Sequence, residues 1–264
     1  MNPRVSLVPA SSFEVHRLGE IDSTNEWLLA AARGGAPDRT VAVAEFQRRG
    51  RGRLDRRWEA PAGSALLSSV LLRVALDAPD RHLATVAVGL AAVEGCRAVR
   101  TIAVGLKWPN DLVVGGCKLG GILAETDGSI AADGSTAIVV GLGVNLTWPG
   151  PSEANGTSIL QETGDAVGRD ELLDAYLGAL SDRADQLCGV EGRDALVRDY
   201  LDELVTIGQA VRVEQPDGVV EGVASGITDQ GHLVIATAQG LRVVTVGDVV
   251  HLRTAGSGPP GPRE

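Results

Sequence analysis

The pattern of apolar and polar positions divides the first two hundred or so residues into alternating strand-like and helix-like segments. Apolar runs, several of them with period two, predict strands at 13–18, 40–46, 64–72, 103–108, 112–114, 122–125 and 136–140. Apolar stripes at helical spacing predict helices that begin near Ser23 and Asp80 and others over 169–188 and 193–204. Ser23 precedes Glu26 by three residues, which is the spacing of a capping box. We therefore predict an α+β domain, a mixed β-sheet with helices packed on it.

After Gly208 the helical stripes stop and short strands follow one another. They are predicted at 211–214, 219–225, 233–236 and 242–246, and glycine occurs in each of the turns between them. We predict three parts: a large domain over 1–206, a small β-barrel domain over 207–254, and a disordered tail over 255–264, which is rich in Gly and Pro.

Composition narrows the class of protein. Hydrophobic residues make up 44% of the chain but aromatic residues only 3%, so the core is built mainly from aliphatic side chains. The net charge of −10 argues against a general nucleic-acid or membrane-surface binder. No uninterrupted apolar run reaches the ~18 residues of a membrane span, and the N-terminal residues lack the apolar core of a signal peptide. Three distant cysteines fit reduced thiols, and the histidines lack metal-ligand spacing, so we expect a cytoplasmic protein without a zinc-type site.

The segment from Gln47 to Trp58 reverses the sign of the chain's charge. It holds six arginines and one acidic residue, Asp55. Guanidinium groups present planar donor pairs that match phosphate and carboxylate oxygens. Gly50 and Gly52 permit positive φ and close approach of the backbone to a ligand. The segment predicts a loop that clamps a polyanion, and a solvated basic loop or a nucleic-acid contact is the alternative.

Three further motifs follow. Residues 107–112 read KWPNDL, where Asp111 is suited to Mg²⁺ and Asn110 to a phosphate or ribose oxygen, although both are also ordinary turn residues. Residues 118–123 read KLGGIL, where Lys118 lies among small residues that leave its ammonium accessible to a ligand. Residues 141–145 read GLGVN, which lacks the third glycine and the helix of a dinucleotide-binding fingerprint.

Four segments in this order resemble the biotin–protein ligase family. They are Ser23–Asn25, Gln47 with GRGR and Trp58, KWPNDL, and KLGGIL with Glu125 and GLGVN. The resemblance covers about residues 20–145 through motifs and extends to about 253 through the small C-terminal barrel. It implies a catalytic domain of the class II synthetase type and an SH3-like barrel.

The resemblance also implies residue roles. Lys118 matches the lysine that bridges the biotin carboxylate and the α-phosphate, and Lys118, Arg51 and Arg53 are the expected catalytic groups. The expected biotin contacts are Ser23, Thr24, Asn25, Gln47, Gly50, Arg51, Arg53, Lys118, Gly121 and Leu123. The expected nucleotide contacts are Arg53, Arg56, Trp58, Asn110, Asp111, Lys118, Asn145 and Trp148. Asp111 is the expected Mg²⁺ ligand.

The implied activity has two steps. Biotin reacts with MgATP to form biotinyl-5′-AMP and pyrophosphate, and biotin is then transferred to a lysine of a biotin carboxyl carrier domain of acyl-CoA carboxylases. Only about twenty residues precede Ser23, so we expect the type without an N-terminal DNA-binding domain. The family loop usually has glycine at Asp55, so we expect Asp55 either to face solvent and pair with Arg56 or Arg57, or to change how the loop closes. The rival interpretations are a lipoate–protein ligase and a nucleic-acid-binding protein.

Overall fold

The computed structural model describes residues 13–252 except Asp55, Ala132, 152–154, 216–217 and Val246. Its main sheet has seven strands in the order β1-β2-β3-β7-β6-β5-β4. The strands are β1 (Glu14–Ile21), β2 (Thr40–Gln47), β3 (Ala65–Val74), β4 (Val104–Lys107), β5 (Asp111–Val114), β6 (Cys117–Glu125) and β7 (Thr136–Asn145). β1 and β2 are parallel and all other neighbours are antiparallel. The predicted mixed sheet is confirmed, and the tail predicted over 255–264 lies outside the described residues.

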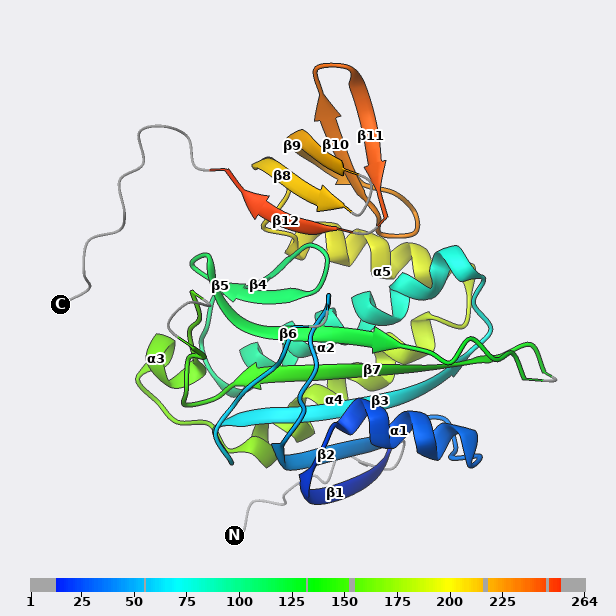
Figure 1. Cartoon of the computed structure of the whole chain (residues 1–264), viewed down its shortest axis with the longest axis vertical. Coiled ribbons are helices and arrows are strands. Elements are labelled where there is room, and N and C mark those ends of the chain that lie inside the picture. The colour runs from blue at the N-terminus through cyan, green and yellow to red at the C-terminus, as the bar shows by residue number, and fades with distance from the viewer. Residues whose placement is uncertain are drawn as a thin grey trace, which may run out of the picture.

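Helices cover both faces of this sheet. α1 (Thr24–Arg33) packs on one face, where Leu28 meets Leu71 and Val139. α2 (His82–Val99), α4 (Arg169–Gln186) and α5 (Val190–Glu203) lie on the opposite side, and their apolar side chains join the largest core cluster (Figure 1). A short helix that the sequence did not predict, α3 (Ile159–Thr163), follows the loop after β7. The face that carries α1 is therefore the less covered one.

The start of α2 differs from the prediction. Asp80 does not cap the helix, because it lies within a 3₁₀ turn, Ala78–Arg81, that runs directly into α2. α2 is apolar on nearly all sides because it is enclosed between the sheet and α4. The segment Ala78–Val99 is long and apolar enough for a membrane span by length and composition, but 72% of its most apolar window is buried inside the protein, as expected of a core helix.

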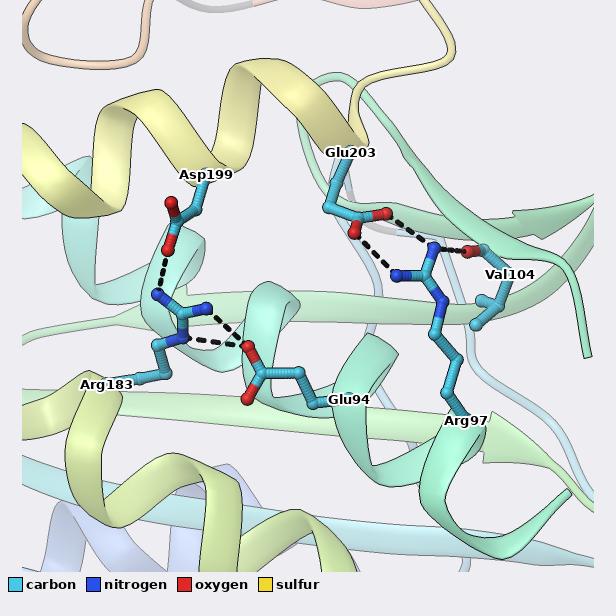
Figure 2. A network of polar contacts seen from close by, with 6 residues as sticks. All are labelled: Glu94, Arg97, Val104, Arg183, Asp199 and Glu203. Atoms are coloured by element: carbon cyan, nitrogen blue, oxygen red, sulfur yellow. Dashed lines mark hydrogen bonds and ion pairs between the residues drawn. The ribbon is translucent and has the colours of Figure 1, made fainter. Parts of the chain in front are cut away.

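Ion pairs join the three helices on that side (Figure 2). Arg183 of α4 pairs with Glu94 of α2 and with Asp199 of α5. Arg97 of α2 donates to both carboxylate oxygens of Glu203, at 2.6 and 2.7 Å, and to the Val104 carbonyl at 2.8 Å. The bonds from Arg97 to Glu203 fix the last residue of α5, from which the chain enters the C-terminal sheet.

The C-terminal sheet is antiparallel and has five strands in the order β11-β10-β9-β8-β12. They are β8 (Ala210–Gln215), β9 (Gly218–Ile227), β10 (Leu233–Thr237), β11 (Gly240–Val244) and β12 (Asp248–His251). The sequence predicted four of these strands and missed β12. Figure 1 places this sheet beside α5 and the β4–β5 hairpin. The small all-β unit is as predicted, and its closure into a barrel stays a prediction.

Candidate active site

The floor of the candidate site is a row of residues that the strand register aligns across the main sheet. Asp111 on β5 pairs with Gly121 on β6, Gly121 pairs with Gly143 on β7, and Gly143 pairs with Leu67 on β3. A second row runs from Leu123 through Gly141 to Ser69. The missing side chains of the glycines leave a depression in the sheet. A cavity of about 720 Å³ lies over it.

The N-terminus of α1 forms the polar end of this cavity. Ser23 is the predicted cap of the helix and accepts from the Glu26 amide. The Thr24 amide and hydroxyl both donate to Gln47 Oε1, at 2.7 and 3.0 Å. Asn25 donates to the Leu123 carbonyl at 3.0 Å. Bonds within the protein thus hold Thr24, Asn25 and Gln47, which the resemblance assigns to biotin, in place.

The arginine segment is a small hairpin. The backbones of Arg51 and Arg57 form an antiparallel β-bridge. The Gly52 amide donates to the Arg56 carbonyl at 2.7 Å, and the Trp58 amide donates to the Gly50 carbonyl at 3.0 Å. Gly50 and Gly52 permit positive φ, but neither adopts it. Gly50 is required for a different reason: a Cβ there would lie 2.2 Å from the Trp58 carbonyl oxygen. Asp55 lies outside the described residues.

Each inward arginine of the hairpin has a polar partner. Arg51 pairs with Glu125, which also accepts from Asn25 at 2.8 Å. Arg53 donates to Asn110 Oδ1 at 3.1 Å and to the Gly247 carbonyl at 3.2 Å. Burial lowers the pKa of the Arg53 guanidinium, and the carboxylate of Asp248 opposes that shift. The hairpin is therefore an ordered wall of the cavity.

Lys118 occupies the middle of the floor. Its Nζ lies 2.6 Å from Asp111 Oδ1 and 5.8 Å from the centre of the Trp58 ring. Trp58 lies against the glycine floor, since a Cβ on Gly143 would come within 2.6 Å of its ring and one on Gly121 within 3.3 Å. The buried Trp58 Nε1 has no hydrogen-bond partner among the described residues. The indole expected to contact the nucleotide thus lies beside Gly121, which was expected to contact biotin.

Most of the predicted site residues line this one cavity. They are Ser23, Thr24, Asn25, Gln47, Arg51, Arg53, Arg56, Trp58, Asn110, Asp111, Lys118, Gly121, Leu123 and Asn145. Gly50 instead lines a second cavity, which shares Arg51, Gly52 and Arg53 with the first. Trp148 packs with Trp58 on Ala60, Ala65 and Leu67, whereas the neighbouring residues 149–151 line the first cavity.

Five charged residues that line the cavity were not among the predicted site residues: Arg57, Glu59, Lys107, Glu214 and Asp248. Lys107 stands in the KWPNDL motif, which is a signal that points to it. Asp248 and Glu214 come from the C-terminal sheet, where they are partners on β12 and β8. Asp248 pairs with Arg53, at 3.7 Å, and with Arg56. Because the sequence did not predict β12, it gave no reason to place a carboxylate of this sheet in the cavity.

The carboxylate of Asp111 suits a magnesium ion that is carried by a nucleotide. Within the described parts of 13–252, no cluster of three His, Cys, Asp or Glu side chains could hold a metal ion. Asp111 offers one carboxylate on the cavity floor, with one oxygen bound to Lys118. Mg²⁺ commonly takes one or two carboxylates and completes its shell with water and phosphate oxygens, and Asp111 fits that role.

Comparisons with known proteins agree with this geometry. Residues 19–145 match the Biotin/lipoate A/B protein ligase family, and residues 206–252 match the Biotin protein ligase C terminal domain. A biotin–[acetyl-CoA-carboxylase] ligase of Mycobacterium tuberculosis is 38% identical over 247 residues, which cover 89% of this chain and 88% of that protein. The chain belongs to the biotin–protein ligase family.

A second sequence relative and a solved structure also support membership of the biotin–protein ligase family. A biotin–[acetyl-CoA-carboxylase] ligase of Paracoccus denitrificans is 32% identical, and the alignment covers 88% of this chain and 98% of that one. The structure of the Aquifex aeolicus biotin protein ligase in complex with biotin and ATP has a TM-score of 0.75 at 25% identity and covers 91% of this chain and 99% of its own. The resemblance inferred from the motifs is therefore confirmed.

Proposed function

We propose that this chain is an ATP-dependent biotin–protein ligase, which forms biotinyl-5′-AMP and transfers the biotinyl group to a lysine of a carrier protein. Family membership supports the ligase class. The observation that carries the proposal is the single cavity, in which an uncharged hydrogen-bonding end at Thr24 and Asn25 continues into a cationic end at Arg53 and Lys118. This order suits a ligand with a neutral polar ring at one end and a phosphate ester at the other.

The first step brings two anions together. A biotin carboxylate oxygen attacks the α-phosphorus of ATP, a new P–O bond forms, and the bond to pyrophosphate breaks. Two unit charges 4 Å apart repel by roughly 4 kcal/mol at an effective dielectric constant of about 20. Arg51, Arg53 and Lys118 offset this repulsion and stabilise the charge of the transition state, because they are already oriented by Glu125, Asn110 and Asp111. Asp111 would hold Mg²⁺, which would neutralise part of the phosphate charge.

The mixed anhydride must be kept from water before transfer. We assign the exclusion of water to the arginine hairpin, because Arg51, Arg53, Arg56 and Arg57 line the cavity and backbone bonds at Gly52 and Trp58 join its two arms. In the second step, the carrier lysine attacks the acyl carbon, an amide bond forms, and AMP leaves.

We propose a biotin carboxyl carrier domain of an acyl-CoA carboxylase as the partner, since the relatives from Mycobacterium tuberculosis and Paracoccus denitrificans are named for acetyl-CoA carboxylase. We propose the cytoplasm as its location, in keeping with three cysteines that are all unpaired; fractionation of cells with an antibody to the protein tests this. A lipoate–protein ligase is the rival activity. The match to the biotin-ligase C-terminal domain favours biotin.

Calorimetry tests the function directly. The wild-type protein should bind biotin, should bind ATP and Mg²⁺ with release of pyrophosphate only when biotin is present, and should label an apo carrier domain. Lipoate in place of biotin should give no pyrophosphate. Binding of lipoate but not biotin would refute the proposal.

The variant Lys118→Ala separates binding from chemistry. It should form adenylate at least about 100-fold more slowly, because a charge that contacts the transition state is lost. It should keep measurable biotin affinity, since Thr24, Asn25 and Gln47 are unchanged. Normal pyrophosphate release by this variant would remove Lys118 from its assigned role.

A further inference from the structure

Trp108 links the nucleotide side of the cleft to the C-terminal sheet. Its indole is 1% exposed, and it is among the largest fully buried side chains of the described residues. Its backbone amide donates to Thr206 Oγ1 at 3.0 Å, and its Nε1 donates to the Gly231 carbonyl at 3.0 Å, in the turn between β9 and β10. Trp108 is also the first residue of the turn 108–110, which contains Asn110 and leads into Asp111 at the start of β5. One side chain therefore ties that turn to a segment more than a hundred residues away.

The C-terminal sheet returns to the cleft at β12. The Gly247 carbonyl accepts from Arg53, and the Asp248 carboxylate pairs with Arg53 and Arg56. Arg53 donates in turn to Asn110, two residues after Trp108. The contacts form a closed ring. Trp108 donates to Gly231 of the sheet, Gly247 and Asp248 of the sheet contact Arg53, and Arg53 donates to Asn110 in the turn that begins at Trp108.

The chain enters the C-terminal sheet from α5, and this entry is another point at which the sheet is attached to the main domain. Glu203 is fixed by Arg97, as Figure 2 shows, and two residues later the Val205 amide donates to the Leu106 carbonyl at 2.9 Å. This anchor precedes β8, and β8 pairs directly with β12, the strand that carries Asp248. The bond between Trp108 and Gly231 is a second anchor, which limits rotation of the sheet about the end of α5.

We propose that Trp108 is a positioning residue for adenylation, which holds the C-terminal sheet where Gly247 and Asp248 orient Arg53 into the cavity. This inference rests on the proposed function, and it gives the C-terminal sheet a part in the nucleotide half of the reaction. Trp108 acts on the reaction through Arg53 and Asn110 and not by contact with the reacting atoms. Its loss should therefore weaken the ATP half of the site and leave the biotin end at α1 unchanged.

The test compares Trp108→Phe, Asp248→Asn and the double variant. Trp108→Phe keeps an aromatic ring but removes the indole N–H, and it should raise the KM for ATP by about 10-fold, which is the effect of one buried hydrogen bond. The Kd for biotin should stay within about twofold of wild type. Asp248→Asn keeps the shape of the side chain and should raise the KM for ATP similarly. Because both act through Arg53, the double variant should be at most about twofold worse than the worse single variant.

Arg183→Gln is the matched control. It breaks the ion pairs to Glu94 and Asp199 (Figure 2), and none of the three residues lines the cavity, so it should lower stability without changing either the KM for ATP or the Kd for biotin. If the effects of Trp108→Phe and Asp248→Asn simply multiply, or if Trp108→Phe weakens biotin and ATP alike, the coupling is absent and the proposal is overturned.

Hydrogen exchange gives a readout that does not depend on activity. The amides of Gly52 and Trp58 are bonded within the arginine hairpin. They should exchange at least about 10-fold faster in Trp108→Phe and in Asp248→Asn, and at the wild-type rate in Arg183→Gln. Wild-type exchange at these amides in both cleft variants overturns the inference even if the enzyme is active. Wild-type protein that forms no biotinyl-adenylate refutes the proposed function, while the exchange rates still decide whether the hairpin depends on Trp108.

Discussion

An alanine at position 141 probes how rigidly the cavity floor and α1 fit together. The Cβ of that alanine would lie 2.3 Å from Asn25 Oδ1 and 3.1 Å from its Cγ. Asn25 is 4% exposed, and its amide is held by Ser69 at 2.6 Å, by the Leu123 carbonyl at 3.0 Å and by Glu125 at 2.8 Å. The amide can avoid the new methyl group only by giving up these bonds.

The cost follows from those three contacts. Each buried hydrogen bond contributes about 1 kcal/mol, so their loss costs about 3 kcal/mol. Replacing glycine restricts the unfolded chain and returns about 0.5–1 kcal/mol. The net destabilisation is about 2–2.5 kcal/mol, or a decrease in Tm of roughly 4–10 °C for a chain of this size. Because Thr24 adjoins Asn25 at the start of the same helix, the Kd for biotin should rise at least about 10-fold.

Urea unfolding and biotin calorimetry on Gly141→Ala measure both effects. Gly178→Ala is the control, because Gly178 lies within α4 and a Cβ there would meet nothing within 4 Å. It should stabilise the protein by about 0.5–1 kcal/mol through helix propensity and leave biotin binding unchanged. If Gly141→Ala unfolded at the wild-type urea concentration and bound biotin normally, Asn25 would not be the fixed wall inferred here.

Three further predictions concern the cavity floor at Gly143, the arginine hairpin, and the dependence of stability on pH. Gly143→Ala places a Cβ 2.6 Å from the Trp58 ring and should weaken biotin binding at least about 10-fold; equal affinity would mean that Trp58 moves freely. Arg53→Gly removes the bonds to Asn110 and Gly247, so trapped biotinyl-adenylate should leave faster, and a wild-type lifetime would contradict the water-excluding role of the hairpin. Burial, followed by the nearby charges of His232 and Arg53, lowers the pKa of His82 from 6.5 to about 4. Below pH 6.5 the unfolded chain binds a proton that the native state does not, so the free energy of unfolding should fall between pH 6.5 and 4. His82→Gln should remove that part of the pH dependence, and an unchanged profile would show that His82 is not held neutral.

The amino-acid sequence by itself determined the elements that depend on local interactions. The cap at Ser23 and the strands of the main sheet were predictable, because caps, turns and apolar periodicity act over a few residues. The motifs also identified Lys118, Asp111 and the arginine segment as site residues. They carry the chemistry in their residue types and spacing, so the family was recognisable without the fold.

Tertiary structure alone decided how these parts meet. Strand register aligns Asp111, Gly121 and Gly143 in one row, and register depends on long-range pairing that no local pattern states. β12 was missed because four residues with charged or polar ends show no clear period. Without it, Asp248 had no predicted place beside Arg53, and the buried contact of Trp108 with Gly231 had no signal in either segment. Local preferences select helices and strands, whereas the site arises from contacts between residues that the chain brings together only on folding.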